Sequence, residues 1–435
     1  MKAKNSLALI FFPAFDWAIS PTHPEREERL LYTQDQIFEE GVEDIAGIRF
    51  FNPDLATAAD VERVHFAYPD VDSIVTESHL IAAGGMMRAL DAVMSKETDK
   101  AFAMVRPPGH HAQRVTYGDR GFCIINIEAV GLEYIRQKHP DLRVAIVDTD
   151  CHHGDGTEDI YWNDPDTLFI SFHQDGRTLY PGTGEQSELG GPAAYGYNIN
   201  IPLPPNTGDE GFLHVLDNVV LPILDDYQPD LIINSAGQDN HYTDPLTNMN
   251  FSAQGYALLN EKLNPDVAVL EGGYSIEGAL PYVNLGIVLA MAGLDYSGVH
   301  EPDYHEGKWR QSLRVTRQVE EISAQVLKTW KERKQLAEKE FKGKDRVSRQ
   351  RQVYYDTAGI METQRQDFFI CGDCPGVNVI HSTNDRSASL LGVQIPRQAC
   401  PNCQKLGYRL YEEAAQIKVK RKFLQDQSSD QFFRA

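Results

Sequence analysis

The chain has 435 residues, 42% of them hydrophobic and 24% charged, which is the composition of a globular protein and not of a disordered or fibrous one. No apolar run approaches the roughly 20 residues that span a bilayer, so we predict no membrane association. The net charge is −22, and residues 1–303 carry 17 Lys and Arg against 47 Asp and Glu, an excess that disfavours nucleic acid and favours cationic substrates or basic protein segments.

Residues 1–295 show β-rich runs that alternate with helical patterns. The runs are Leu7–Phe12, Ala101–Val105, Val144–Val147, Thr167–Ser171, Leu231–Ser235 and Val267–Leu270. Helical patterns lie between them, for example over Ser78–Ser95 and Gly211–Tyr227. This order predicts an α/β fold with a mostly parallel sheet covered by helices. Ser6 to Phe15 also has the apolarity of a short signal peptide, but Pro13 interrupts it and we favour a buried first strand.

Four polar segments follow predicted strands, where functional sites of open α/β sheets collect. The first is Arg106-Pro107-Pro108-Gly109-His110-His111. Its Pro and Gly residues predict a tight turn that presents two adjacent histidines. Because imidazole takes up or releases protons near pH 7, the pair suits general acid–base catalysis, although a His-His pair alone is weak evidence.

The second segment is Asp148-Thr149-Asp150-Cys151-His152-His153-Gly154-Asp155-Gly156. Successive strand residues point to opposite faces, so Asp148, Asp150 and His152 can point the same way while Cys151 points oppositely. Carboxylate and imidazole are good Zn²⁺ ligands, and buried aspartates without a cation would be costly. The segment therefore favours a metal site over a polar loop with capping aspartates.

The third segment, Ser235-Ala236-Gly237-Gln238-Asp239, supplies one more carboxylate. The fourth, Leu270-Glu271-Gly272-Gly273-Tyr274, has two glycines that let the backbone pass close to a site, and it delivers a tyrosine hydroxyl there. Each sequence is common by itself. Their order along the chain is a strong signal.

In this order the four segments resemble the histone deacetylase family of the arginase–deacetylase superfamily, over roughly residues 5–295. Four further stretches also match: His23-Pro24-Glu25-Arg26, Gly121-Phe122-Cys123, Ser171-Phe172-His173 and Pro181-Gly182-Thr183-Gly184. The resemblance implies a three-layer arginase/deacetylase-like fold and zinc-dependent hydrolysis of an acetyl amide. The Leu-Glu-Gly-Gly-Tyr sequence is similar to that of class II members.

The resemblance also implies a metal site and its catalytic neighbours. The implied zinc ligands are Asp150, His152 and Asp239, which leave room for water and the substrate carbonyl. His110 and His111 would share the roles of general base and general acid. Asp148 would orient His110, Asp155 would orient His111, and Tyr274 would donate to the developing oxyanion.

A substrate tunnel and a second ion follow from the same resemblance. The implied tunnel residues are Phe122, Tyr180, Leu246 and Gly273. The implied ligands of a structural potassium ion are oxygens of Asp148, Asp150, His152, Ser171 and Phe172. We expect Cys123 and Cys151 to be buried apolar residues and not nucleophiles.

The substrate is less narrowly defined than the chemistry. Polyamine-preferring relatives carry a glutamate where this chain has Leu246, so we expect acetyl-lysine in proteins as the substrate, with acetylpolyamines or other small acetylamines as the alternative. An arginase-like enzyme with two manganese ions is disfavoured by Asn240 after Asp239. A non-catalytic acetyl-lysine reader is disfavoured because every catalytic position is filled.

The sequence changes in character at about residue 304. Lys308 to Lys344 is rich in charged residues, and Val319, Ile322, Val326 and Trp330 recur at helical spacing, which predicts a long helix packed along or between domains. We therefore predict a catalytic domain over residues 1–303, a charged helical connector over 304–359 and a compact cysteine-bearing module over 360–435.

Four cysteines of this module form two C-x-x-C pairs: Cys371, Cys374, Cys400 and Cys403. Their spacing predicts a closed, structural zinc site of the ribbon type, with a redox-active thiol pair as the alternative. The module offers a surface for a protein partner or for self-association. Because the six cysteines do not form the pattern of a disulfide-stapled secreted domain, we expect a reducing, cytoplasmic location.

Overall fold

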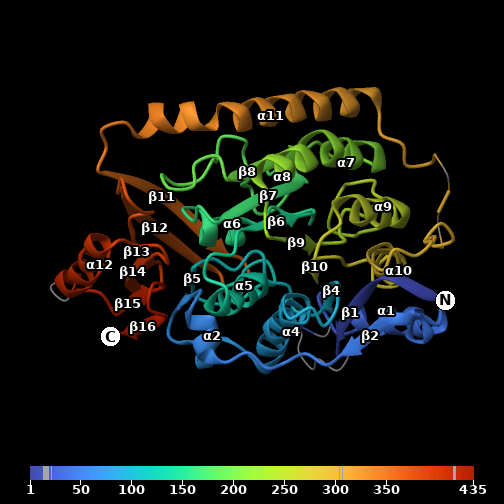
Figure 1. The fold of residues 1–435 in the computed structure, drawn as a ribbon, viewed down its shortest axis with the longest axis horizontal. Helices are drawn as coiled ribbons and strands as arrows, with labels where there is room; N and C mark the ends of the chain where they lie inside the picture. Colours follow the sequence, from blue (N-terminus) through green and yellow to red (C-terminus); the bar gives the residue numbers. More distant parts are fainter. Residues whose placement is uncertain (13–18, 21, 303, 306, 415–417) are drawn as a thin grey trace.

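The computed structural model describes residues 1–12, 19–20, 22–302, 304–305, 307–414 and 418–435. An eight-stranded sheet with the order β2-β1-β4-β10-β9-β6-β7-β8 forms its centre (Figure 1). The strands are β1 (Lys2–Phe11), β2 (Ala46–Phe51), β4 (Lys100–Met104), β6 (Val144–Asp148), β7 (Thr167–Gln174), β8 (Asn198–Leu203), β9 (Leu231–Ala236) and β10 (Val267–Leu270). All neighbouring strands are parallel, which confirms the predicted sheet.

Helices cover both faces of this sheet and give the predicted three layers (Figure 1). One layer contains α1 (Glu28–Glu39), α7 (Asp209–Val215), α8 (Leu221–Tyr227), α9 (Ala253–Leu263) and α10 (Leu280–Met291). The opposite layer contains α2 (Ala58–Glu62), α4 (Glu77–Met94) and α5 (Ile127–Lys138). Short elements complete the fold: η1 (Val42–Asp44), β3 (Phe66–Ala67), α3 (Val71–Ile74), β5 (Val115–Thr116), α6 (Asp155–Tyr161) and η2 (Leu216–Val220).

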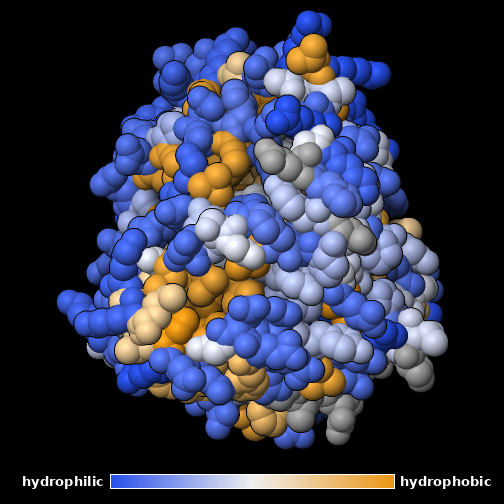
Figure 2. All heavy atoms as spheres, turned by 90° about the vertical axis from the view of Figure 1, so that its right-hand side faces the viewer, coloured by the Kyte–Doolittle hydropathy of each residue, from blue (hydrophilic) through white to orange (hydrophobic). Residues whose placement is uncertain are grey.

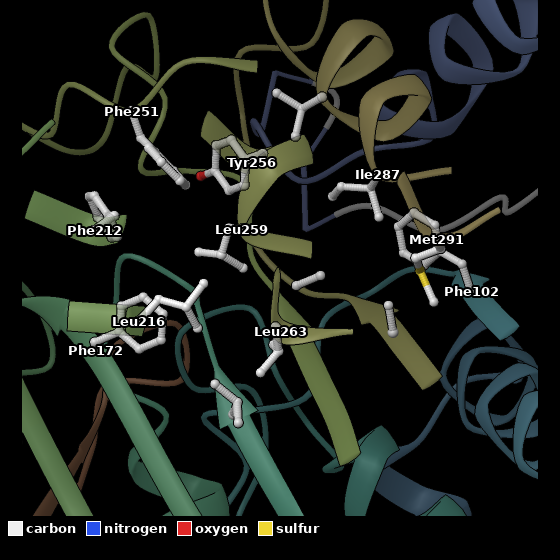
Figure 3. Close-up of a cluster of buried hydrophobic side chains, with 14 of the residues drawn as sticks. Phe102, Phe172, Phe212, Leu216, Phe251, Tyr256, Leu259, Leu263, Ile287 and Met291 are labelled. Carbon is white, nitrogen blue, oxygen red and sulfur yellow. The ribbon is translucent and has the colours of Figure 1, made fainter. Parts of the chain in front are cut away.

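The largest apolar core lies between the sheet and the layer of α7 to α10. Figure 3 shows ten labelled side chains of this cluster: Phe102, Phe172, Phe212, Leu216, Phe251, Tyr256, Leu259, Leu263, Ile287 and Met291. Residues of β6 are fully buried on both faces, because the sheet is covered on both sides. The polar residues that follow the strands therefore extend from the edge of a sheet that is packed on both faces.

The sequence analysis did not predict two strands of the sheet, β2 and β8. Both β2 and β8 are strands at the edges of the sheet, and β2 is half exposed. Strand β8, Asn198–Leu203, alternates asparagine with apolar residues and lacks the continuous apolar run of a central strand. The predicted first strand is present as Lys2–Phe11, and residues 13–15 of the Ser6 to Phe15 stretch lie outside the described residues.

The predicted long helix is α11 (Leu313–Phe341), which lies along the molecule against α7 and β8 (Figure 1). Its buried residues include Val319, Val326 and Trp330, as the helical spacing predicted. The helical connector over residues 304–359 needs correction, because Arg346–Tyr355 forms strand β11. Gly343, with φ of +74°, lies just beyond the helix, and the chain then alternates exposed with less exposed residues, as a strand does.

The C-terminal part is a second sheet packed beside the first (Figure 1). Its strands follow the order β11-β12-β13-β14-β15-β16, and every pair is antiparallel except β14 with β15. The later elements are β12 (Ile360–Phe369), β13 (Val377–Asn384), β14 (Ser389–Ile395), α12 (Pro401–Glu413), β15 (Arg421–Asp426) and β16 (Gln431–Arg434). Helix α12 lies between β14 and β15 in the chain and makes the crossover that parallel neighbours require.

Among the described residues, no helix combines the length and the apolarity needed to cross a bilayer. The face to the right in Figure 1 is mostly hydrophilic, with apolar residues gathered in patches (Figure 2). Exposed apolar side chains include Leu31 and Phe38 of α1.

Candidate active site and metal centres

Asp150, His152 and Asp239 form a compact group beyond the carboxyl ends of the neighbouring strands β6 and β9. One donor atom from each residue lies within 4.8 Å of the others. His152 Nδ1 is 2.8 Å from Asp239 Oδ2 and 3.2 Å from Asp150 Oδ1. Both carboxylates are fully buried, so a cation is needed to offset their desolvation. This donor set fits the three protein ligands of a catalytic Zn²⁺.

Two glycines lie against the carboxylates of Asp150 and Asp239. The N–H of Gly272 donates to Asp150 Oδ2 at 2.7 Å. A Cβ on Gly272 would lie 2.4 Å from Asp239 Oδ2, and a Cβ on Gly237 would lie 2.0 Å from Asp150 Oδ2. Gly237 and Gly272 are therefore required, because the carboxylates of the metal-ligand group (Asp150, His152 and Asp239) approach their backbone too closely for a Cβ.

Two histidine–aspartate pairs flank this group. His110 Nδ1 lies 3.1 Å from Asp148 Oδ2, and His111 Nδ1 lies 2.9 Å from Asp155 Oδ1. The two imidazole centroids are 4.1 Å apart, and His110 Nε2 is 3.8 Å from Asp150 Oδ1. A carboxylate on Nδ1 fixes the ring and leaves Nε2 available for proton transfer. The structure thus brings together the pairs that the sequence predicted.

The two adjacent histidines differ in protonation. Burial, reinforced by the charge of His110, lowers the pKa of His111 to about 3, so its imidazole is neutral. Burial also disfavours a charge on His110, but the carboxylates of Asp150 and Asp148 outweigh it and raise the pKa of His110 well above its usual value. At neutral pH the two rings therefore differ in charge: His111 presents a neutral imidazole and His110 a protonated one.

Tyr274 reaches the same region from the turn after β10. Its side chain is 7% exposed, and its ring centroid lies 5.6 Å from that of Phe122, edge to face. The N–H of Tyr274 donates to Asp244 Oδ2 at 2.7 Å, and the guanidinium of Arg29 stands 5.1 Å from the Tyr274 ring. Burial raises the pKa of the phenol well above its usual value, so the hydroxyl stays protonated and can donate.

The predicted tunnel residues surround these groups. The ring of Tyr180 lies 5.2 Å from that of His111 and 6.5 Å from that of His152. The ring of Phe122 contacts that of Tyr274. Gly273, whose φ is +124°, directly precedes Tyr274 in the chain. Leu246 is 37% exposed, and its N–H donates to Asp244 Oδ1, while Asp244 Oδ2 accepts from the N–H of Tyr274.

Buried arginines that the sequence analysis did not single out support the site. Arg106 binds both oxygens of Glu25, at 2.8 and 2.6 Å, and Arg29 binds Glu25 at 3.1 Å. Arg29 also donates to the carbonyl of Gly273 at 2.7 Å. The i,i+4 spacing of Glu25 and Arg29 was a usable signal in the sequence. Arg120, which pairs with Asp155 at 2.7 Å, carried no such signal.

The C-terminal sheet reaches the site through the turn between β11 and β12. Asp356 Oδ1 in this turn accepts hydrogen bonds from the N–H of Gly121 at 2.9 Å and from the hydroxyl of Tyr180 at 3.3 Å. More than 230 positions separate Asp356 from Gly121. No local pattern indicated this contact, and only the packing of the second sheet creates it.

Ion pairs fix the second sheet on helix α6. Arg349 of β11 pairs with Glu158 at 3.3 Å, and Arg351 pairs with Asp159. Glu158 also lies 3.3 Å from His153 Nε2. Helix α6 begins with Asp155, so the same short helix orients His111 and carries the ion pairs with the second sheet.

The predicted potassium ligands lie on neighbouring strands. Asp148 is paired with Ser171 in the ladder between β6 and β7, and Phe172 follows on β7. The potassium site itself stays a prediction. Cys123 and Cys151 are fully buried, and burial raises both thiol pKa values well above their usual range, so neither has the environment of a nucleophile.

The four C-terminal cysteines converge on one point. Their sulfur atoms all lie within 4.8 Å of one another, with Cys371 Sγ 3.9 Å from Cys400 Sγ. Cys371 and Cys374 lie between β12 and β13, while Cys400 and Cys403 begin α12. Backbone N–H groups of this helix start lower the pKa of Cys400 to about 7. Four convergent thiols suit a closed tetrahedral zinc site with no position left for substrate.

The chain is similar to a described protein family and to several known proteins. The family model of the histone deacetylase domain matches residues 67–285. A "Probable deacetylase" of Archaeoglobus fulgidus is 43% identical over 345 residues, which cover 72% of this chain and 95% of that protein.

Two further similarities extend the comparison. A "Histone deacetylase-like amidohydrolase" of Pseudomonas aeruginosa is 35% identical over 231 residues, which cover 51% of this chain and 60% of that protein. Among solved structures, the crystal structure of the HDA15 HD domain superposes with a TM-score of 0.64 at 26% identity, over 79% of this chain and 99% of that one.

Proposed function

Because the chain belongs to the histone deacetylase family, we propose that this deacetylase removes acetyl groups from N-ε-acetyl-lysine in proteins, with one catalytic zinc held by Asp150, His152 and Asp239. The observation that carries the proposal is the convergence of these three donor atoms beside two histidine–aspartate pairs. A bound Zn²⁺ polarises the acetyl carbonyl and makes a coordinated water more acidic.

The residues around the metal-ligand group divide the proton transfers. His111 is neutral and oriented by Asp155, so it is placed to take the proton of the attacking water. His110, oriented by Asp148, is placed to protonate the leaving amine. The hydroxyl of Tyr274 is protonated and donates to the oxygen that gains negative charge as water adds to the carbonyl.

The pocket residues support a long, unbranched acylated side chain. Phe122 and Tyr180 offer aromatic surfaces beside Tyr274 and His111 respectively, and an alkyl chain can pack against both. Leu246 is exposed and apolar, which favours acetyl-lysine over a substrate that needs a glutamate there.

The Cys₄ group holds a second, structural zinc in this proposal. Its ligands join the β12–β13 connection to the start of α12 and so tie the second sheet together. Potassium bound near Asp148 and Ser171 remains part of the proposal by family resemblance.

The test combines metal analysis with turnover. The purified chain should contain about two zinc ions and should deacetylate an acetyl-lysine peptide, and His111→Ala should abolish turnover. Activity on acetylputrescine with none on the peptide would move the enzyme to small acetylamines. Two zinc ions with neither activity would contradict the proposed reaction.

A further inference from the structure

We infer that Asp356 is a specificity-determining residue, which makes the enzyme prefer acetylated amines that carry a second positive charge just outside the tunnel. The inference deepens the proposed function and rests on it. The residue comes from the second sheet, yet its carboxylate stands at the entrance to the catalytic group.

The first argument is position. Asp356 Oδ1 binds the N–H of Gly121, next to Phe122, and the hydroxyl of Tyr180. It therefore joins the two aromatic surfaces between which the acyl chain would pass. Gly121 and Phe122 both have positive φ, +56° and +68°, so this wall adopts a backbone conformation that needs outside support.

The second argument is rigidity, because a residue that selects substrates must be held in place. The β11–β12 hairpin packs on the catalytic part through a shared apolar cluster that includes Tyr117, Tyr355 and Ile380. Tyr355 donates to the carbonyl of Val115 at 3.0 Å, directly before the turn. The turn is thus anchored while Asp356 itself is exposed.

The third argument is charge. Oδ1 takes both hydrogen bonds that Asp356 accepts from described residues, so Oδ2 of this exposed residue accepts none from them. Asp119 lies close by, bonded to Thr357 of the same turn, and burial together with the charge of Asp356 raises the pKa of Asp119 to about 7. Neither aspartate forms an ion pair with a described residue, and the nearby His23, whose pKa burial lowers despite the charge of Asp356, does not supply a permanent cation. A cation on the substrate would supply the missing countercharge.

The test compares matched substrates that differ in one charge. The first pair is an acetyl-lysine peptide with a neighbouring arginine and the same peptide with glutamine there. The second pair is N-acetylputrescine and N-pentylacetamide, in which a methyl group replaces the ammonium. The measured quantity is the ratio of kcat/KM for the cationic over the neutral member, on zinc-loaded full-length protein.

Asp356→Asn should lower this ratio about two- to fivefold, the effect of one exposed ion pair, and mainly through KM. Asp356→Glu keeps the charge and should keep the preference, which separates charge from loss of folding. Asp345→Asn is the matched control, because this substitution removes the same charge. Asp345 is exposed and lies just before β11, at the end of the strand away from Asp356. The substrate pair whose kcat/KM ratio falls in Asp356→Asn shows whether the recognised cation belongs to a peptide or to a small amine.

An unchanged ratio in Asp356→Asn, with an active wild type, would overturn this inference alone. A ratio lowered equally by Asp345→Asn would also overturn it, since the effect would then be one of net charge. A zinc-loaded wild type inactive on all four substrates would overturn the proposed function and this inference with it.

Discussion

His111 Nδ1 lies 2.9 Å from Asp155 Oδ1, and this carboxylate is buried with Arg120 as its second partner. Asp155→Asn removes the charge that orients the imidazole. We expect kcat to fall about 10- to 100-fold, as for other carboxylate partners of site histidines, with zinc content unchanged. Steady-state kinetics with metal analysis would show this, and a wild-type kcat would exclude the orienting role.

Tyr274→Phe removes only the hydroxyl. Because the ring remains packed against Phe122, we expect the fold and the zinc content to be retained while kcat falls about 10²- to 10³-fold, the cost of one oxyanion donor. Turnover equal to the wild type would disprove the assignment of the oxyanion donor to this tyrosine.

Gly272→Ala places a Cβ 2.4 Å from Asp239 Oδ2 and 2.7 Å from Asp150 Oδ2. We expect loss of the catalytic zinc and of activity, because both ligand carboxylates must move. Gly298→Ala is the matched control, since no atom lies within 4 Å of its Cβ. Metal analysis of the two variants tests the expectation, which fails if both retain two zinc ions.

Cys371→Ser removes one thiolate of the Cys₄ group. We expect zinc content to fall by about one ion and the second sheet to lose stability. Hydrogen exchange of β12 to β14 would locate the change. Loss of the catalytic zinc instead would mean that the assignment of the two metal sites is wrong.

Glu362 should make stability depend on pH. Burial raises the pKa of this carboxyl from 4.5 to about 7 in the folded protein. The folded state therefore binds the proton more tightly than the unfolded state, so the contribution of Glu362 to stability is greatest below pH 4.5 and is lost as pH rises through about 7. The expected loss is about 3 kcal/mol.

Glu362→Gln keeps the neutral shape and should flatten that slope. Denaturant unfolding between pH 4.5 and 7.5 measures the change. Equal slopes in the two proteins would show that Glu362 does not titrate in this range.

The central sheet could be predicted from sequence because it depends on local patterns, and central strands such as β6 are apolar up to their last residue, Asp148. The set of metal ligands, which joins Asp150 and His152 to the distant Asp239, came from the family resemblance. The edge strand β8 was missed since its asparagines resemble a loop, and β11 was assigned to a helical connector. Contacts such as Asp356 with Tyr180 join distant parts of the chain, so only tertiary packing reveals them.

The position of helix α6 has a consequence for truncation of the chain. Its first residue, Asp155, serves the active site, while Glu158 and Asp159 one turn later are neutralised by arginines of β11. A chain shortened before Arg346 would lose both arginines, so that Glu158 would keep His153 as its charged neighbour and Asp159 would lose its ion pair. Loss of the second sheet would therefore reach the active site through the helix that orients His111.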